Sequence, residues 1–243
     1  MNDFPSLPVR AASSNLPKPA GELVFRQNTS SPFRTHMMIA TARKLAGGLL
    51  QPLRQAARRL AVQAQAKTLR PLNVILGAGS VEMPGWIATD SDVLDVRSPR
   101  AWRRLFAHGS IDRLMAEHLF EHLSNAECAR AFTECFRYLR GGGLLRIAVP
   151  DGHRKDPEYV EEVSPPKDGH QLLFTVDDLM QRLVRLGFHV TPLEYFDAKG
   201  EFHCYPWSEN DGLIRRSARY DTQERFKIGA LYYTSLIVDA RKP

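Results

Sequence analysis

The sequence is poor in cysteine and has no long apolar run. Its 243 residues contain three cysteines, Cys128, Cys135 and Cys204, which are too few and too scattered for a disulfide framework. No stretch approaches the roughly 18 consecutive apolar residues that a membrane span needs, and the first residues lack the apolar core of a secretory signal. We therefore expect no transmembrane span and a reducing compartment, the cytoplasm.

Acidic residues are scarce in the first 70 positions. Only Asp3 and Glu22 lie there, against 11 lysines and arginines, so this part carries a charge of +9 while the remainder carries −3 of the overall +6. The basic character belongs to an N-terminal extension and not to the body of the protein. We therefore expect no nucleic-acid partner.

The N-terminal extension has two parts. Residues 1–35 are rich in Pro, Ser and Asn, which predicts a disordered or extended tail. Residues 36–70 are predicted to form a basic helical extension, broken into two short helices by Gly47, Gly48 and Pro52. The residues at helical spacing are Leu45, Leu49, Leu53, Ala57 and Leu60. This helix could pack on its own domain with its charges outward, or contact a membrane surface or a protein partner. An organellar transit peptide is a further alternative.

Strand and helix patterns alternate over residues 71–243, which are predicted to form one domain. The pattern predicts an α/β fold, Rossmann-like and doubly wound, with a mostly parallel sheet, helices on both faces and an antiparallel last strand. Helices are expected after the capping residues Ser124 and Thr175, the first of them stopped by the glycines at 141–143. The expected strands are residues 73–76, 86–89, 111–119, 144–149, 190–196 and 232–238.

A glycine-rich turn follows the first of these strands. Gly77, Ala78 and Gly79 would let a ligand approach the backbone closely, because the two glycines carry no Cβ. Asp90 ends the next strand, where a carboxylate can accept hydrogen bonds from ribose hydroxyls. The same residues would also be found if Gly77–Gly79 formed an ordinary tight turn and Asp90 only capped the next turn.

Two longer stretches resemble a known family. The runs are LNVILGAGSVEMPGWIATD and IDRLMAEHLFEHLSNAECARAFTECFRYLRGGGLLRIAVPD. Their order and spacing resemble those of small bacterial methyltransferases of class I, which use S-adenosyl-L-methionine (SAM). The resemblance covers about a quarter of the chain, and it implies a SAM-dependent methyltransferase.

The resemblance also implies roles for particular residues. Gly77, Ala78 and Gly79 would line the methionine end of SAM, Asp90 would hold the ribose, and Asp95 would lie near the adenine. Glu117, His118 and Leu119 would flank the sulfonium. Glu121 and His122 match a Glu-His pair that contributes more to architecture than to chemistry in many members of the family.

The sequence departs from the family pattern at two positions. Ile75 stands where the family has an acid, and Val81 stands where it has a third glycine. The nine residues 77–85 that join the first two strands are also fewer than the dozen or more of a usual parallel crossover. No full helix fits there, and we expect the basic helix of residues 40–66 to cover the exposed sheet face.

The acceptor side would be built from polar loops. One follows the strand at 144–149 and contains Asp151, His153, Asp156, Asp168 and His170, and a later one contains Arg215 and Arg216. His153 or His170, paired to a carboxylate, could serve as a general base. Together with His122 of the Glu-His pair, these are the candidate catalytic residues. A mixed His and carboxylate metal site is an alternative, but the spacing matches no compact zinc signature and we expect no metal. A solvated lid without chemistry is the third interpretation, and the arginine pair could clamp an anionic acceptor.

The sequence thus favours a SAM-dependent methyltransferase that acts on oxygen or nitrogen of a small-molecule or saccharide-type acceptor. A catalytically inactive scaffold of the same fold is the main alternative, because Ile75 and Val81 weaken the cofactor motif. A nicotinamide-dependent oxidoreductase fits less well, since the interval from turn to acid is shorter than the roughly 20 residues of the dinucleotide fingerprint.

Overall fold

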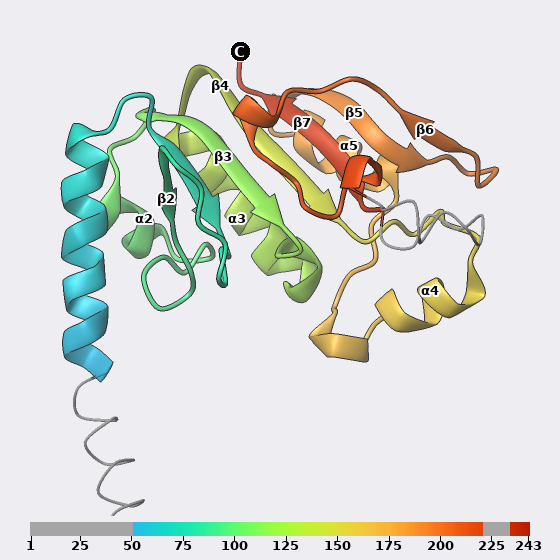
Figure 1. Ribbon diagram of the computed structural model, residues 1–243, viewed down its shortest axis with the longest axis horizontal. Helices are drawn as coiled ribbons and strands as arrows, with labels where there is room; N and C mark the ends of the chain where they lie inside the picture. Colours follow the sequence, from blue (N-terminus) through green and yellow to red (C-terminus); the bar gives the residue numbers. More distant parts are fainter. Residues whose placement is uncertain (1–50, 221–233) are drawn as a thin grey trace, which may run out of the picture. The chain divides into compact units, whose positions relative to one another are not determined.

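The computed structural model describes residues 51–220 and 234–243 (Figure 1). The expected tail of residues 1–35 and the first part of the basic extension lie outside this range, as do residues 232 and 233 of the last expected strand. Within the described residues, no helix is both long and apolar enough to cross a lipid bilayer.

The core of the protein is a seven-stranded sheet in the order β2-β1-β3-β4-β7-β5-β6. Strands β1, β2, β3 and β4 are mutually parallel, whereas β7 runs antiparallel to both β4 and β5. The expected Rossmann-like α/β fold with an antiparallel last strand is confirmed. The strands are β1 (Asn73–Leu76), β2 (Trp86–Ala88), β3 (Ile111–Glu117), β4 (Leu139–Val149), β5 (His189–Phe196), β6 (Phe202–Cys204) and β7 (Leu236–Arg241).

The two longer labelled helices, α3 (Asn125–Tyr138) and α5 (Val176–Val184), pack against one face of the sheet. The other α-helices are α2 (Pro99–Leu105) and α4 (Pro157–Val163), together with a helix over residues 51–68. Figure 1 shows α3 and α5 behind the sheet. Their apolar side chains, such as Phe132 and Leu179, join the main core cluster with the strand residues that face them. Both helices begin at the expected caps, since Ser124 and Thr175 accept hydrogen bonds from the amides of Glu127 and Asp178.

The three glycines at 141–143 do not stop α3, contrary to the expectation from sequence. The helix ends at Tyr138, and β4 begins at Leu139 and runs through the glycines. A Cβ on Gly143 would come within 2.9 Å of the Arg140 carbonyl oxygen and 3.2 Å of the Ile111 carbonyl oxygen. The pairing of β3 with β4 shifts register between Ile111 and Arg113. The glycine therefore permits a close backbone approach at this irregularity.

The helix of residues 51–68 turns a different face inward from the one expected. Val62 and Ala66 are buried in the main core, whereas Leu53 and Leu60 are exposed. The charged side chains point outward as expected, since Arg58 is exposed, and two of them make surface contacts: Arg58 pairs with Asp92, and the Arg59 guanidinium donates to the Asp92 carbonyl oxygen at 2.8 Å. Val62 and Ala66 thus join the same core cluster as the apolar side chains of α3. Residues 40–50 of the expected covering helix lie outside the described residues, so its covering role stays a prediction.

The second face of the sheet carries no α-helix among the described residues. Its core cluster consists of strand residues such as Met115 and Ile237, covered by Trp207 and Ile214 from the segment of residues 205–220. We call this segment the covering segment, and it contains the short 3-10 helices η3 (Glu209–Asp211) and η4 (Ala218–Tyr220). The expected helices on the second face are thus 3-10 turns. The nine-residue connection between β1 and β2, which contains no helix, adds Val81 and Met83 to this cluster.

Two buried charged side chains attach the covering segment to the sheet. Arg146, with 1% of its side chain exposed, forms a bidentate ion pair with Asp239, its cross-strand neighbour, at 2.7 and 2.8 Å. Its remaining donor group binds the carbonyl oxygens of Ser208 and Gly212 at 2.6 and 2.7 Å. Glu194 accepts hydrogen bonds from the Trp207 indole at 2.7 Å, the Ser217 hydroxyl at 2.6 Å and the Ala218 amide at 2.8 Å. The position of the covering segment is therefore set by polar contacts.

Replacing Arg146 by methionine is expected to lower the free energy of unfolding by about 3 kcal/mol, because the change leaves the largely buried Asp239 carboxylate and two backbone carbonyl oxygens of the covering segment without their partner. The matched control is Arg140→Met, which removes an exposed guanidinium that pairs with the similarly buried Asp112 and should remove about 1 kcal/mol or less. Urea unfolding followed by circular dichroism measures both values. Equal, small losses for the two variants would show that the buried pair does not hold the covering segment.

The capping box of α3 makes stability depend on pH. Hydrogen bonds from the Ser124 amide and hydroxyl, and then the Arg97 guanidinium, lower the pKa of Glu127 from 4.5 to about 2. A carboxylate with a lowered pKa stabilises the fold above its unfolded pKa and loses this effect as the pH falls toward the folded value. Wild type should therefore be more stable than Glu127→Gln at pH 7, and the difference should shrink between about pH 4.5 and 2. Urea unfolding of both proteins at pH 7, 4 and 3 tests this; a constant difference would contradict it.

Candidate functional site

The turn after β1 and the acid after β2 contact each other directly. Gly77 and Gly79 have φ angles of 64° and 54°, in the left-handed region that favours glycine. The Gly79 amide donates to the Asp90 carboxylate at 2.9 Å, and the Ala78 amide donates to the Thr89 carbonyl oxygen at 2.9 Å. A Cβ on Gly79 would meet nothing within 4 Å. The glycine turn and Asp90 therefore form one unit that opens onto free space.

The carboxyl end of β3 lies next to this turn, because β1 and β3 are parallel neighbours. Glu117 ends β3 and accepts a hydrogen bond from the Arg216 amide of the covering segment at 2.8 Å. His118 follows with a φ of 54°, which is unusual for a residue with a side chain. Its Nε2 lies 2.9 Å from the Ser235 hydroxyl. Leu119 packs beneath the glycine turn, where a Cβ on Gly77 would approach its Cδ1 to 3.0 Å.

A cavity of about 300 Å³ lies between the glycine turn, the end of β3 and the covering segment. Four of the residues expected at the cofactor line it, namely Gly77, Ala78, Glu117 and His118. The other lining residues are Ile75, Ser80, Val81, Met115, Arg215 and Arg216. We call this the first cavity. Gly79, Asp90 and Leu119 are not among its lining residues. Gly79 belongs to the glycine turn, and Asp90 and Leu119 contact that turn as described above.

Asp95, expected near the adenine, takes part in an ion-pair network instead. Its carboxylate accepts hydrogen bonds from the side chain and the amide of Arg97, at 2.8 and 3.0 Å, and these lower the pKa of Asp95. Arg97 also pairs with Glu127 of the α3 capping box at 2.9 Å. Asp95 lines neither the first cavity nor the second one described next, so its role at the adenine stays a prediction.

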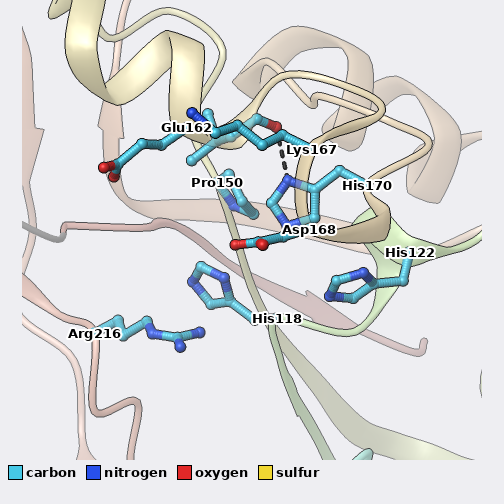
Figure 2. Close-up of a pocket in the computed structure, with 9 residues that line it drawn as sticks. His118, His122, Pro150, Glu162, Lys167, Asp168, His170 and Arg216 are labelled. Atoms are coloured by element: carbon cyan, nitrogen blue, oxygen red, sulfur yellow. Dashed lines mark hydrogen bonds between the residues drawn. The ribbon is translucent and has the colours of Figure 1, made fainter.

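A second cavity of about 400 Å³ adjoins the first, and Figure 2 shows the side chains around it. It lies between the turn after β3 and the segment that contains α4 and the 3-10 helix η2 (Lys167–Gly169). His118 and Arg216 line both cavities. The remaining lining residues of the second cavity are His122, Pro150, Glu162, Val163, Lys167, Asp168 and His170. The two cavities therefore meet at one histidine and one arginine.

Two of the three expected catalytic histidines lie next to each other in the lining of the second cavity. The ring centroids of His122 and His170 are 4.9 Å apart. His122 belongs to the 3-10 helix η1 (Phe120–His122), and His170 follows η2. The amides of Gln171 and Leu172 donate to the Glu121 carbonyl oxygen at 2.7 and 3.0 Å. These hydrogen bonds join two segments that are about 50 residues apart in the sequence.

His153, the third expected catalytic histidine, lines neither cavity. It lies next to Asp151, which accepts hydrogen bonds from the amides of His153 and Phe196 at 2.9 and 2.7 Å. Burial raises the pKa of Asp151. This aspartate ties the end of β4 to the end of β5, so the His153 segment has an architectural contact here.

Sequence reasoning missed several residues of the site. Ser235 contacts His118 although 117 positions separate them, and no local motif marks such a pair. Glu162 and Lys167 were passed over because a solvated loop contains the same residue types. Only the strand order could have indicated that these residues meet, because parallel strands bring their carboxyl ends to one edge of the sheet.

Comparisons with known proteins found weakly similar solved structures and no match in sequence. None of the known family models matches the sequence, and none of the curated proteins does. A SAM-dependent methyltransferase from Archaeoglobus fulgidus is 13% identical, with 80% of this chain and 98% of that chain covered and a TM-score of 0.42. A SAM-dependent methyltransferase from Thermotoga maritima is 15% identical, with coverages of 86% and 99% and a TM-score of 0.41. A third, from Mesorhizobium loti, is 14% identical, with coverages of 75% and 96% and a TM-score of 0.40.

Proposed function

We propose that the protein is a SAM-dependent methyltransferase that acts on oxygen or nitrogen of a small-molecule or saccharide-type acceptor. The observation that carries the proposal is the pair of adjoining cavities at the carboxyl edge of the sheet. The first cavity adjoins the glycine turn and Asp90, and the second is polar. Methyl transfer needs two ligands whose reactive atoms meet, and the shared His118 and Arg216 mark where they would meet.

The charges around the first cavity fit the parts of SAM. The amino-acid end of this cofactor carries an ammonium and a carboxylate, and the lining includes the Glu117 carboxylate and the Arg215 guanidinium. Glu117 can therefore stand in for the acid that Ile75 replaces in the family pattern. Asp90 retains lone pairs for ribose hydroxyls, since each of its oxygens accepts one hydrogen bond, from the amides of Gly79 and Ser91.

The mechanism places most of the work on alignment. Bound SAM would supply a methyl group that is already activated by the sulfonium. The glycine turn and Asp90 would fix the cofactor, while the second cavity would orient the acceptor, an effect worth several kcal/mol. His122 and His170 lie where they could take a proton from the acceptor, and His153 does not line this cavity.

The second cavity favours a polar acceptor. Its lining contains charged side chains of both signs, Lys167 and Arg216 against Glu162 and Asp168. Such a mixture suits hydroxyl and amine groups better than an apolar or a purely anionic molecule. A saccharide-type acceptor meets this description. The cellular location of the protein, expected to be the cytoplasm, stays a prediction.

Titration calorimetry with S-adenosylhomocysteine tests the cofactor proposal. Wild type should bind with micromolar affinity, and Asp90→Ala should bind about 10- to 100-fold more weakly because the ribose loses charge-assisted hydrogen bonds. The matched control is Asp92→Ala, which removes an acid two residues away that pairs with Arg58 and should leave the affinity unchanged. Binding of NAD alone would indicate an oxidoreductase. Silence toward every nucleotide would indicate a scaffold, the interpretation that Ile75 and Val81 keep open.

Arg215 gives a second, sharper test because it would contact only the amino-acid end of the ligand. Arg215→Ala should lower the affinity for S-adenosylhomocysteine about tenfold and leave the affinity for adenosine unchanged. Asp90→Ala should lower both affinities. A loss of adenosine binding in Arg215→Ala would mean that the cofactor lies in the first cavity in another orientation.

A further inference from the structure

Three potential metal ligands gather at the second cavity. Glu121, His122 and His170 each offer one ligand atom, and these atoms all lie within 4.8 Å of one another. Glu121 and His122 are consecutive residues of η1, and His170 comes from the segment after η2. Figure 2 shows the rings of His122 and His170 on the same side of the cavity, beside the Asp168 carboxylate.

The Glu121 carboxylate is fully buried and has an ion-pair partner, His118, but no hydrogen bond from the described residues. Nδ1 of His118 lies at ion-pair distance, 3.0 Å, from Oε1. Buried carboxylates are paired, hydrogen-bonded or coordinated to metal ions. An ion among these residues would give the Glu121 carboxylate a second partner besides His118.

His170 is prepared for coordination by its outer contact. Its Nδ1 lies 2.7 Å from the Val163 carbonyl oxygen, the dashed line in Figure 2, and a carbonyl can only accept a hydrogen bond. Nδ1 therefore carries the proton, and Nε2 keeps the lone pair that binds a metal. A histidine held by a backbone carbonyl in this way is the usual arrangement around metal ions.

The backbone holds the three residues together without help from a ligand. The amides of Gln171 and Leu172 bind the Glu121 carbonyl oxygen, and the Gln171 side chain donates to the His122 carbonyl oxygen at 2.8 Å. The two segments that supply the ligands are thus joined by three hydrogen bonds. A site fixed in this way needs little rearrangement to bind an ion.

We propose that Glu121, His122 and His170 bind one divalent transition-metal ion at the second cavity. Two imidazoles and a carboxylate are ligands that suit Zn²⁺, Mn²⁺ or Fe²⁺. Three protein ligands leave a coordination position open, as in catalytic zinc sites. An acceptor hydroxyl bound there would lose its proton more readily. With the ion bound, His122 and His170 would serve as ligands and would no longer be available as the general base. This proposal departs from the expectation of no metal and gives Glu121 and His122 a chemical role besides an architectural one.

A second cluster of similar composition provides the control. Asp197, Glu201 and His203 also lie close together, but Asp197 accepts hydrogen bonds from the amides of Lys199 and Glu201 and contacts His203 Nε2 at 3.0 Å. Its carboxylate is satisfied without an ion. Removing His203 should therefore leave metal binding unchanged.

Titration of the metal-free, untagged full-length chain with Co²⁺ tests the proposal, because bound Co²⁺ has visible absorption bands, and calorimetry with Zn²⁺ provides the affinity. Wild type should bind one equivalent, while Glu121→Gln and His170→Ala should each weaken binding at least tenfold and His203→Ala should not. His122→Gln is the second variant if the buried Glu121→Gln fails to fold by circular dichroism. No saturable binding by wild type, or a loss in His203→Ala alone, would overturn the proposal. Titration with S-adenosylhomocysteine reports separately on the cofactor, so either proposal can fail alone.

Discussion

The buried ion pair between Arg146 and Asp239 determines how the second face of the sheet is closed. A helix would normally cover such a face with apolar side chains, but here the guanidinium lies on the sheet and binds two backbone carbonyl oxygens of the covering segment. Because Trp207 also packs on this guanidinium, with 4.7 Å from its ring centroid to the guanidinium carbon, the segment has a fixed path. That path brings Arg215 and Arg216 to the first cavity.

The site itself follows from the direction of the strands. Strands β1, β3 and β4 are parallel, so the residues after them, Gly77, His118 and Pro150, meet at one edge. His118 and Asp168 both have positive φ angles, 54° and 51°, and both line the second cavity. Such backbone conformations are unfavourable for residues with side chains, and they concentrate at functional sites. The two strained residues of the described chain that are not glycine thus lie where the proposed acceptor would bind.

Local signals made much of the fold predictable from the sequence. The caps at Ser124 and Thr175 are read from a few neighbouring residues and were correct. Most strands were found as well, but the last strand lies at Leu236–Arg241 and not at 232–238, and β6 was not predicted. The glycines after α3 were misinterpreted because their role depends on the approach of Ile111, about 30 residues away. The inward face of the helix at 51–68, the Asp95 ion pair and the contact of His118 with Ser235 likewise depend on partners that are remote in the sequence. The candidate site was therefore predictable at its glycine turn and at His122 and His170, and less so elsewhere.

The turn after β3 connects the two proposals. Glu117 and His118 line the first cavity, whereas Glu121 and His122 lie four residues further on and contribute to the proposed metal site beside the second. The Glu121 carboxylate lies 3.0 Å from Nδ1 of His118, so an ion at Glu121 would lie close to the border that His118 forms. The positive φ of His118 directs the chain around this border. If both proposals hold, one short segment would position a methyl donor on one side and an activated acceptor on the other.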